Sequence, residues 1–313
     1  MTRLPVPART ATTARPGPVR AWAAMLVAGV LALALPVGAT PQPAGDAHTH
    51  NKGLLWKIET TAVRPSFLFG TIHSDDARLA SLPAPVKARF DQAASFTMEA
   101  LANAADMLAM AEAMYFNDGN TLEDVLDKKL YRRTLQALAT RGLPAESAHK
   151  MKPWAAMMTL SLPPPTTGLF LDLALQLEAA RQSKPTYGLE TMAEQVAVFD
   201  ELRLEDQVEL LRDSVANLHR LDRQVEELIQ AYLRRDLGGL AAIERKYRIG
   251  DARLNELLTG RLLVTRNRVM LERMQPRLRE GNAFIAVGAL HLHGNDGLLA
   301  LLEKNGYRVS AVY

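Results

Sequence analysis

The chain contains several short apolar runs, each long enough for one strand. Residues 54–58 and 67–69 flank a polar turn around Pro65, and this spacing predicts an antiparallel hairpin. Residues 94–99 form the next run, and residues 283–287 are apolar throughout and rich in Phe, Ile and Val, as in a strand that is covered on both faces. We therefore predict that both arms of the chain supply strands to one sheet.

Between these arms, the apolar residues recur mainly at helical spacing. Residues 101–160 are rich in Ala, Leu and Met, residues 169–181 predict a further helix, and residues 193–274 carry many Arg and Glu on predicted outer faces. A strand-like run at 184–190 interrupts the helices. The pattern predicts an α/β fold with a central mixed sheet from the N- and C-terminal arms, covered by helices, and a large helical insertion at about 101–270.

Residues 1–39 have the pattern of a secretory signal peptide. Four Arg precede an apolar run, and small residues follow at the spacing of a cleavage site. The run approaches the roughly 18 residues that span a membrane, so an uncleaved anchor is the alternative. We favour cleavage because small residues and Pro follow the run instead of basic ones. The polar, Pro-containing residues 40–52 predict a linker before a single domain at 53–313.

Removal of this segment changes the charge of the chain. Four of the 37 Lys and Arg residues lie in 1–39, which leaves 33 against 34 Asp and Glu. A nearly neutral chain lacks the basic footprint of a nucleic-acid partner. We expect a periplasmic or secreted protein, or alternatively a membrane-anchored, periplasm-facing one. Membrane association is expected only through an uncleaved N-terminus. The chain has no Cys, which excludes disulfides and thiol catalysis.

Residues that could bind a metal or act in catalysis follow several of the predicted strands. Two runs end in Gly-x-x-His, which places His73 and His291 just past a strand, and the glycine permits a sharp turn or a close backbone approach. Two other runs end in a carboxylate, Glu99 and Glu190. Ligands of open α/β sheets bind beyond the carboxyl ends of the strands. The four side chains are therefore predicted to converge on one crevice.

Two imidazoles with one or two carboxylates form the ligand set of mononuclear metal sites in hydrolases and oxygenases. A divalent metal in such a site acidifies water into a nucleophile near neutral pH. A carboxylate that is not a metal ligand can then accept the proton. The residues at the strand ends thus predict a mononuclear metal site of the kind found in hydrolases and oxygenases.

Further motifs occur in a fixed order along the chain. They are Leu68 to His73, Leu82-Pro83, Met98-Glu99, Gly188 to Thr191, Glu194-Gln195, Arg266-Asn267, Val287 to Gly294, Gly297 to Leu299, and Gly306 to Val309. Together they resemble the TraB/GumN family, which includes the Tiki-like proteases, and the resemblance covers about residues 54–313.

The resemblance implies a metal-dependent hydrolase. Together with the signal-peptide pattern, the leading hypothesis is an exported hydrolase, with a peptidase favoured. Its metal ligands would be His73, His291 and Glu99, and the metal a divalent ion such as Zn, Mn or Co. Glu99, Arg266 and Glu190 are the catalytic candidates, with Arg266 as an anion-stabilising group. The implied substrate is a peptide or protein.

Two other functions fit the same residues. The histidines could bind haem or sequester a metal in a non-catalytic envelope protein, since an axial histidine in an apolar slot suffices for haem. Alternatively, the strand-end residues could form a hydrogen-bonded core in an envelope-assembly factor.

Overall fold

The computed structural model describes residues 50–61, 63–164 and 168–313. The predicted signal peptide at 1–39 and all but the last three residues of the predicted linker at 40–52 therefore lie outside the described residues.

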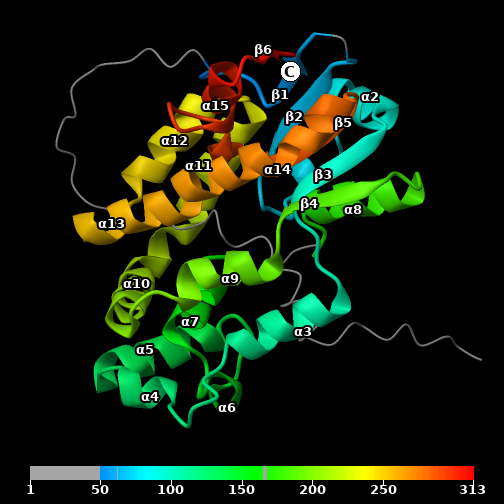
Figure 1. The fold of residues 1–313 in the computed structure, drawn as a ribbon. Helices are drawn as coiled ribbons and strands as arrows, with labels where there is room; N and C mark the ends of the chain where they lie inside the picture. The colour runs from blue at the N-terminus through cyan, green and yellow to red at the C-terminus, as the bar shows by residue number, and fades with distance from the viewer. Residues whose placement is uncertain (1–49, 62, 165–167) are drawn as a thin grey trace, which may run out of the picture.

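Across the described residues, six strands form one mixed sheet in the order β4-β3-β5-β2-β1-β6 (Figure 1). The strands are β1 (Leu55–Glu59), β2 (Ser66–Thr71), β3 (Ser95–Ala100), β4 (Thr186–Glu190), β5 (Ala283–Gly288) and β6 (Arg308–Ala311). β1 pairs antiparallel with β2, which confirms the predicted hairpin, and β6 adds to the other edge of β1. The predicted mixed sheet from the two arms of the chain is confirmed.

The four strands β2, β5, β3 and β4 are parallel neighbours. Thr71 is opposite Gly288 in the β2–β5 pair, and Met98 is opposite Ala286 in the β3–β5 pair. β4 pairs with β3 at the sheet edge, so that Ala100 is opposite Glu190. All four strands consequently present their carboxyl ends at the same edge of the sheet.

Helices cover the sheet and form a second lobe. The α-helices are α2 (Ala84–Gln92), α3 (Ala104–Ala113), α4 (Leu122–Val125), α5 (Lys128–Ala139), α6 (Ala145–Ala148), α7 (Pro153–Leu160), α8 (Leu171–Arg181), α9 (Met192–Asp200), α10 (Leu204–Asn217), α11 (Leu221–Leu233), α12 (Leu237–Lys246), α13 (Ala252–Thr259), α14 (Arg266–Glu280) and α15 (Leu298–Lys304). Shorter segments are the 3₁₀ turns η2 (Ala77–Leu79), η3 (Leu218–Arg220) and η5 (Ala289–His291), and the π-helix η4 (Gly260–Thr265).

Side-chain alternation along β3 decides which helix covers which face. Phe96 contacts Phe90 of α2 edge-on, with ring centroids 5.4 Å apart, and both rings are fully buried. Glu99 is an odd number of residues away and lies on the opposite face, where it meets Arg266 of α14. The sheet is therefore enclosed between α2 on one face and α14 on the other.

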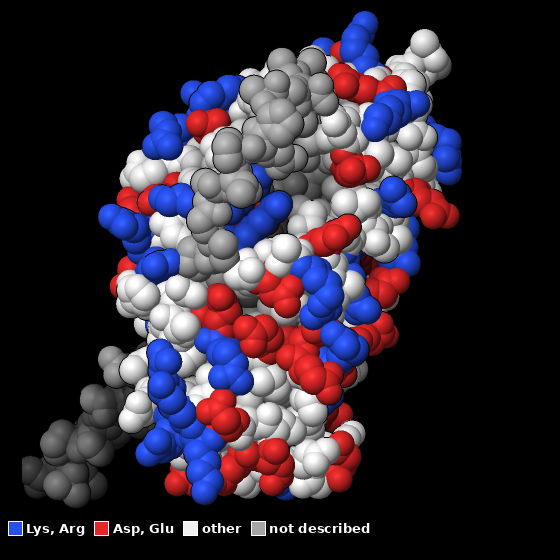
Figure 2. Space-filling model, turned by 90° about the vertical axis from the view of Figure 1, so that its left-hand side faces the viewer, with Lys and Arg blue, Asp and Glu red and all other residues white. Residues whose placement is uncertain are grey.

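The predicted helical insertion contributes one strand and a core of its own. β4 lies within it and joins the sheet, as its strand-like sequence indicated. Residues of α4 to α7, α9 and α10, which form the lower lobe of Figure 1, build a separate apolar cluster with residues of α13, and in this cluster Trp154 stacks on Phe199. Within the described part of the chain, no helix has the length and apolar character needed to cross a membrane. Figure 2 shows Lys and Arg interspersed with Asp and Glu on one face of the molecule.

Candidate functional site

The carboxyl edge of the four parallel strands carries all four predicted strand-end residues. Glu99 and Glu190 lie at the ends of β3 and β4, while His73 follows β2 and His291 ends the turn η5 after β5. These four residues are predominantly buried, and His291 is completely so. The convergence expected from the sequence is therefore present in the fold.

The ring of His291 is held in one tautomer. Its Nδ1 lies 2.6 Å from Oδ1 of Asn267, and the Nδ2 of the same amide donates to the carbonyl oxygen of Asp296 at 2.8 Å. Because the amide oxygen only accepts, Nδ1 of His291 must donate its proton. Nε2 then carries a lone pair. It is buried without a hydrogen-bond partner in the described structure and lies 3.6 Å from Oε1 of Glu99.

His73 is held by a carboxylate instead of an amide. Its Nδ1 lies 2.8 Å from Oδ2 of Asp172, in the first turn of α8, and the hydroxyl of Thr71 donates to the other carboxylate oxygen at 2.8 Å. Nε2 of His73 is also buried, and no partner for it occurs among the described residues. In both histidines, Nε2 is thus the buried ring nitrogen that has no hydrogen-bond partner among the described residues.

Arg266 joins the two glutamates in one buried network. Its Nε and Nη2 donate to Glu190 at 2.7 to 3.1 Å, and Nη2 also donates to Oε2 of Glu99 at 2.9 Å. Oε1 of Glu99 accepts from the backbone N–H of Gly288 at 2.5 Å. Arg266 begins α14 directly after the π-helix η4, a type of distortion that often occurs at functional sites.

The charges of the network set the protonation states. Burial by itself would raise the pKa of Glu99, but the neighbouring histidines, Arg266 and the Gly288 N–H lower it to about 2. Burial lowers the pKa of His291 to about 3, which Arg266 and His73 favour and Glu99 opposes. For His73, burial acts downward, but Asp172 and Glu99 outweigh it and raise the pKa. Near neutral pH, Glu99 is therefore an anion and His291 is neutral.

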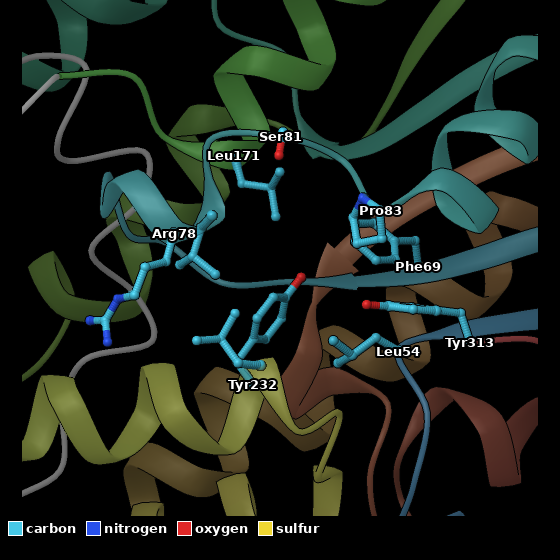
Figure 3. Close-up of a pocket in the computed structure, with 10 residues that line it drawn as sticks. Leu54, Phe69, Arg78, Ser81, Pro83, Leu171, Tyr232 and Tyr313 are labelled. Atoms are coloured by element: carbon cyan, nitrogen blue, oxygen red, sulfur yellow. The ribbon is translucent and has the colours of Figure 1, made fainter.

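Close packing fixes the strand ends that carry the histidines. A Cβ on Gly70 would lie 2.9 Å from Leu292 and 3.0 Å from the backbone of Ala289, so only glycine allows η5 to cross β2 here. The carbonyl oxygen of Gly70 accepts from the Tyr232 hydroxyl of α11 at 2.8 Å. Figure 3 shows Tyr232 reaching toward β2 beside a small, mostly apolar cavity of about 50 Å³.

The arrangement has partly the character of a metal site. In the part of the chain that the structure describes, no group of three or more His, Asp or Glu side chains forms a ready-made metal cage. Two atoms bound at about 2.0–2.1 Å to one tetrahedral metal lie roughly 3.4 Å apart. The 3.6 Å between Nε2 of His291 and Oε1 of Glu99 is close to that spacing. In donor type, the two imidazoles and Glu99 suit a divalent ion.

The structure also identifies site residues to which the sequence pattern gives no role. Asp172 and Asn267 orient the two histidines, Thr71 fixes Asp172, and Gln195 donates to Glu190 at 3.3 Å. Asn267 was visible as the neighbour of Arg266 in a shared motif. Asp172 received no role from the sequence, because it lies 99 residues beyond His73 at the start of an ordinary helix.

Comparisons with known proteins give consistent matches. A family model described as the TraB/PrgY/gumN family matches residues 54–311. The chain is 26% identical over 309 residues to metalloprotease TIKI2 of Xenopus tropicalis, covering 82% of this chain and 59% of the relative. It is 25% identical over 316 residues to the metalloprotease TIKI homolog of Nematostella vectensis, covering 82% and 66%. For metalloprotease TIKI1 of Homo sapiens, the match is 25% over 309 residues, covering 82% and 61%.

The chain thus spans less than two thirds of the length of each of these relatives. No solved structure matches it. Because the family model covers most of the chain, including all four strand-end residues, the chain belongs to the TraB/PrgY/gumN family.

Proposed function

We propose that the protein is an exported metal-dependent hydrolase that acts on peptides or proteins. The names of its relatives, which are metalloproteases at about 25% identity, support this reaction class. Export rests on the sequence pattern of residues 1–39 alone. The substrate class, peptides or proteins, rests on the names of the relatives and is part of the proposal.

One observation carries the proposal: two buried imidazoles, each with an uncommitted Nε2, lie at the ends of adjacent parallel strands. Unpartnered polar atoms are rare in protein interiors and call for an explanation. Metal-binding histidines almost always donate their other ring N–H to a carboxylate or carbonyl oxygen, as His73 does to Asp172 and His291 to Asn267. His73, His291 and Glu99 would hold the metal.

The formal charge of the site supports the same assignment. Glu99, Glu190 and Asp172 contribute three carboxylates, and Arg266 contributes one guanidinium. With both imidazoles neutral, which metal binding requires of His73 because a protonated ring has no lone pair, this buried group would carry a formal charge of −2, and a divalent cation would balance it. Zn, Mn and Co are the candidate ions, since imidazole and carboxylate donors suit each of them.

When bound, such an ion supplies Lewis-acid polarisation of a scissile carbonyl and lowers the pKa of water. The residues of the site orient the metal ligands and one another. With a pKa of about 2, Glu99 is a strong ligand and a poor proton acceptor near neutral pH. Because Arg266 already donates hydrogen bonds to both glutamates, we propose that it orients Glu99 and does not bind an anion directly. Glu190 anchors Arg266. Because it is not a proposed metal ligand, it is the candidate that accepts a proton.

Purified protein tests this function directly. We expect copurified Zn, Mn or Co, and hydrolysis of an unfolded polypeptide such as reduced casein that EDTA stops and added metal restores. Failure to hydrolyse any polypeptide despite stoichiometric metal would reject the peptidase assignment. A Soret band in the absorption spectrum would instead support the haem-binding alternative.

Asp172 is expected to tune metal affinity through His73. Asp172→Asn keeps an oxygen that can accept from Nδ1 but removes the charge, so the affinity for Zn or Mn should fall by about 10- to 100-fold. Titration against a chromophoric chelator measures this without any substrate. Glu178→Gln, a change of charge on the same helix that does not touch His73, is the matched control. Equal affinity of Asp172→Asn and wild type would contradict the role.

A further inference from the structure

A cavity of about 230 Å³ lies between α3 and α9. The two helices pack against each other in the lower half of Figure 1. Apolar side chains line the cavity, chiefly Met110, Met192 and Val196, together with several alanines. Its polar lining consists of carboxylates, Asp106, Asp200 and Glu201, and no Lys or Arg is among the described lining residues.

The three carboxylates differ in how many hydrogen bonds and ion pairs they form. Asp200 accepts from Lys152 at 2.7 Å and from the indole N–H of Trp154 at 2.8 Å. Asp106 accepts from the backbone N–H of Asn103 in the capping box of α3, which leaves one of its oxygens available. Glu201 is exposed at the end of α9, and within the described residues its carboxylate has neither a hydrogen-bond nor an ion-pair partner.

Two residues that line the cavity also contact the end of β3. Met110 and Met192 pack on Ala100, the residue after Glu99, and Met192 follows Glu190 by two. On the other side of α9, a second cavity of about 270 Å³ also includes Glu201 and reaches Glu190 and Arg266. Glu201 therefore borders two cavities, one of which opens on the network that orients Glu99.

We propose that the cavity between α3 and α9 is a subsite for a lysine or arginine side chain of a polypeptide substrate, an inference that rests on the proposed hydrolase function. Lys and Arg bury an aliphatic stem along apolar surface and keep the charged head group at its polar edge. Here Met110, Met192 and Val196 would contact the stem, and Glu201 with Asp106 would bind the head group. Charge-assisted hydrogen bonds to a carboxylate are stronger than neutral ones.

Peptide binding tests the subsite separately from catalysis. The probes are fluorescein-labelled, amidated Ala-Ala-Lys-Ala-Ala and the same peptide with norleucine, which keeps the stem and lacks the ammonium group. Fluorescence anisotropy with EDTA present, so that nothing is cleaved, should give a Kd about tenfold lower for the lysine peptide. Combining Glu201→Gln with Asp106→Asn, which retains the capping acceptor, should bring the two Kd values within about twofold.

Glu205→Gln, an exposed change in the first turn of α10, is the control and should keep the tenfold preference. Equal binding of both peptides by the wild type, or an unchanged preference in the double variant, would overturn the subsite. A clear lysine preference without hydrolysis of any polypeptide would support the subsite and count only against the proposed hydrolase function.

Discussion

The Glu99→Gln variant is expected to lose about 100-fold or more of the hydrolytic activity while it remains folded. In the wild type, a carboxylate with a pKa of about 2 faces the lone pair of His291 Nε2 at 3.6 Å. Gln has nearly the same size and keeps one acceptor oxygen, but it lacks the negative charge that would attract a divalent cation. Activity on reduced casein, metal content and thermal melting are the three measurements.

The stability of this variant distinguishes a functional role from a structural one. Removing one partner of a buried ion pair costs about 3–5 kcal/mol when the other charge is left alone. In Glu99→Gln, Arg266 keeps its contacts with Glu190. The main loss of stability then comes from the amide N–H₂ of Gln, a donor that faces the guanidinium donors, and it amounts to about 1–3 kcal/mol. If the Glu99→Gln protein melts, binds metal and hydrolyses casein like the wild type, the proposed role of Glu99 as a metal ligand is wrong.

The second large effect is on stability. Adding Zn, Mn or Co at about 100 times its Kd should raise the free energy of unfolding by about 2.7 kcal/mol, because the ion binds only the folded chain. For a protein of this size, that corresponds to a rise in melting temperature of roughly 5 °C or more. The double variant His73→Ala/His291→Ala should lose the rise, because both Nε2 ligands are gone.

Differential scanning fluorimetry in EDTA and in metal measures this difference. His219→Ala, which removes an exposed imidazole far along the chain from both strand ends, is the control and should keep the full rise. If the double variant were stabilised by metal as much as the wild type, the ion would bind elsewhere and the proposed ligands would be wrong.

Much of the site was predictable because its main residues are encoded by local pattern. An apolar run followed by Gly-x-x-His indicates both the end of a strand and a histidine just beyond it, and this identified His73 and His291. Glu99 and Glu190 were found in the same way. Their convergence was predictable from a general property of parallel strands, whose carboxyl ends share one edge of the sheet.

The partners of these residues were not predictable from local pattern. Asp172 reaches His73 only because α8 packs beside the end of β2, and the guanidinium of Arg266 lies between Glu99 and Glu190 only because α14 crosses the face of β3 that carries Glu99. These contacts are the reason that we propose Glu99 as a metal ligand and Arg266 as the residue that orients it. A carboxylate next to a guanidinium is held ionised, and a guanidinium with two carboxylate partners has few donors left for a substrate.

The sequence by itself thus determined the sheet and the residues at its strand ends, because strand periodicity and glycine turns depend on neighbours along the chain. The tertiary structure alone decided the tautomer of His291, the charge of Glu99 and the cavity between α3 and α9. Each of these depends on groups that are distant in sequence, and burial makes their mutual effects strong because water no longer screens them.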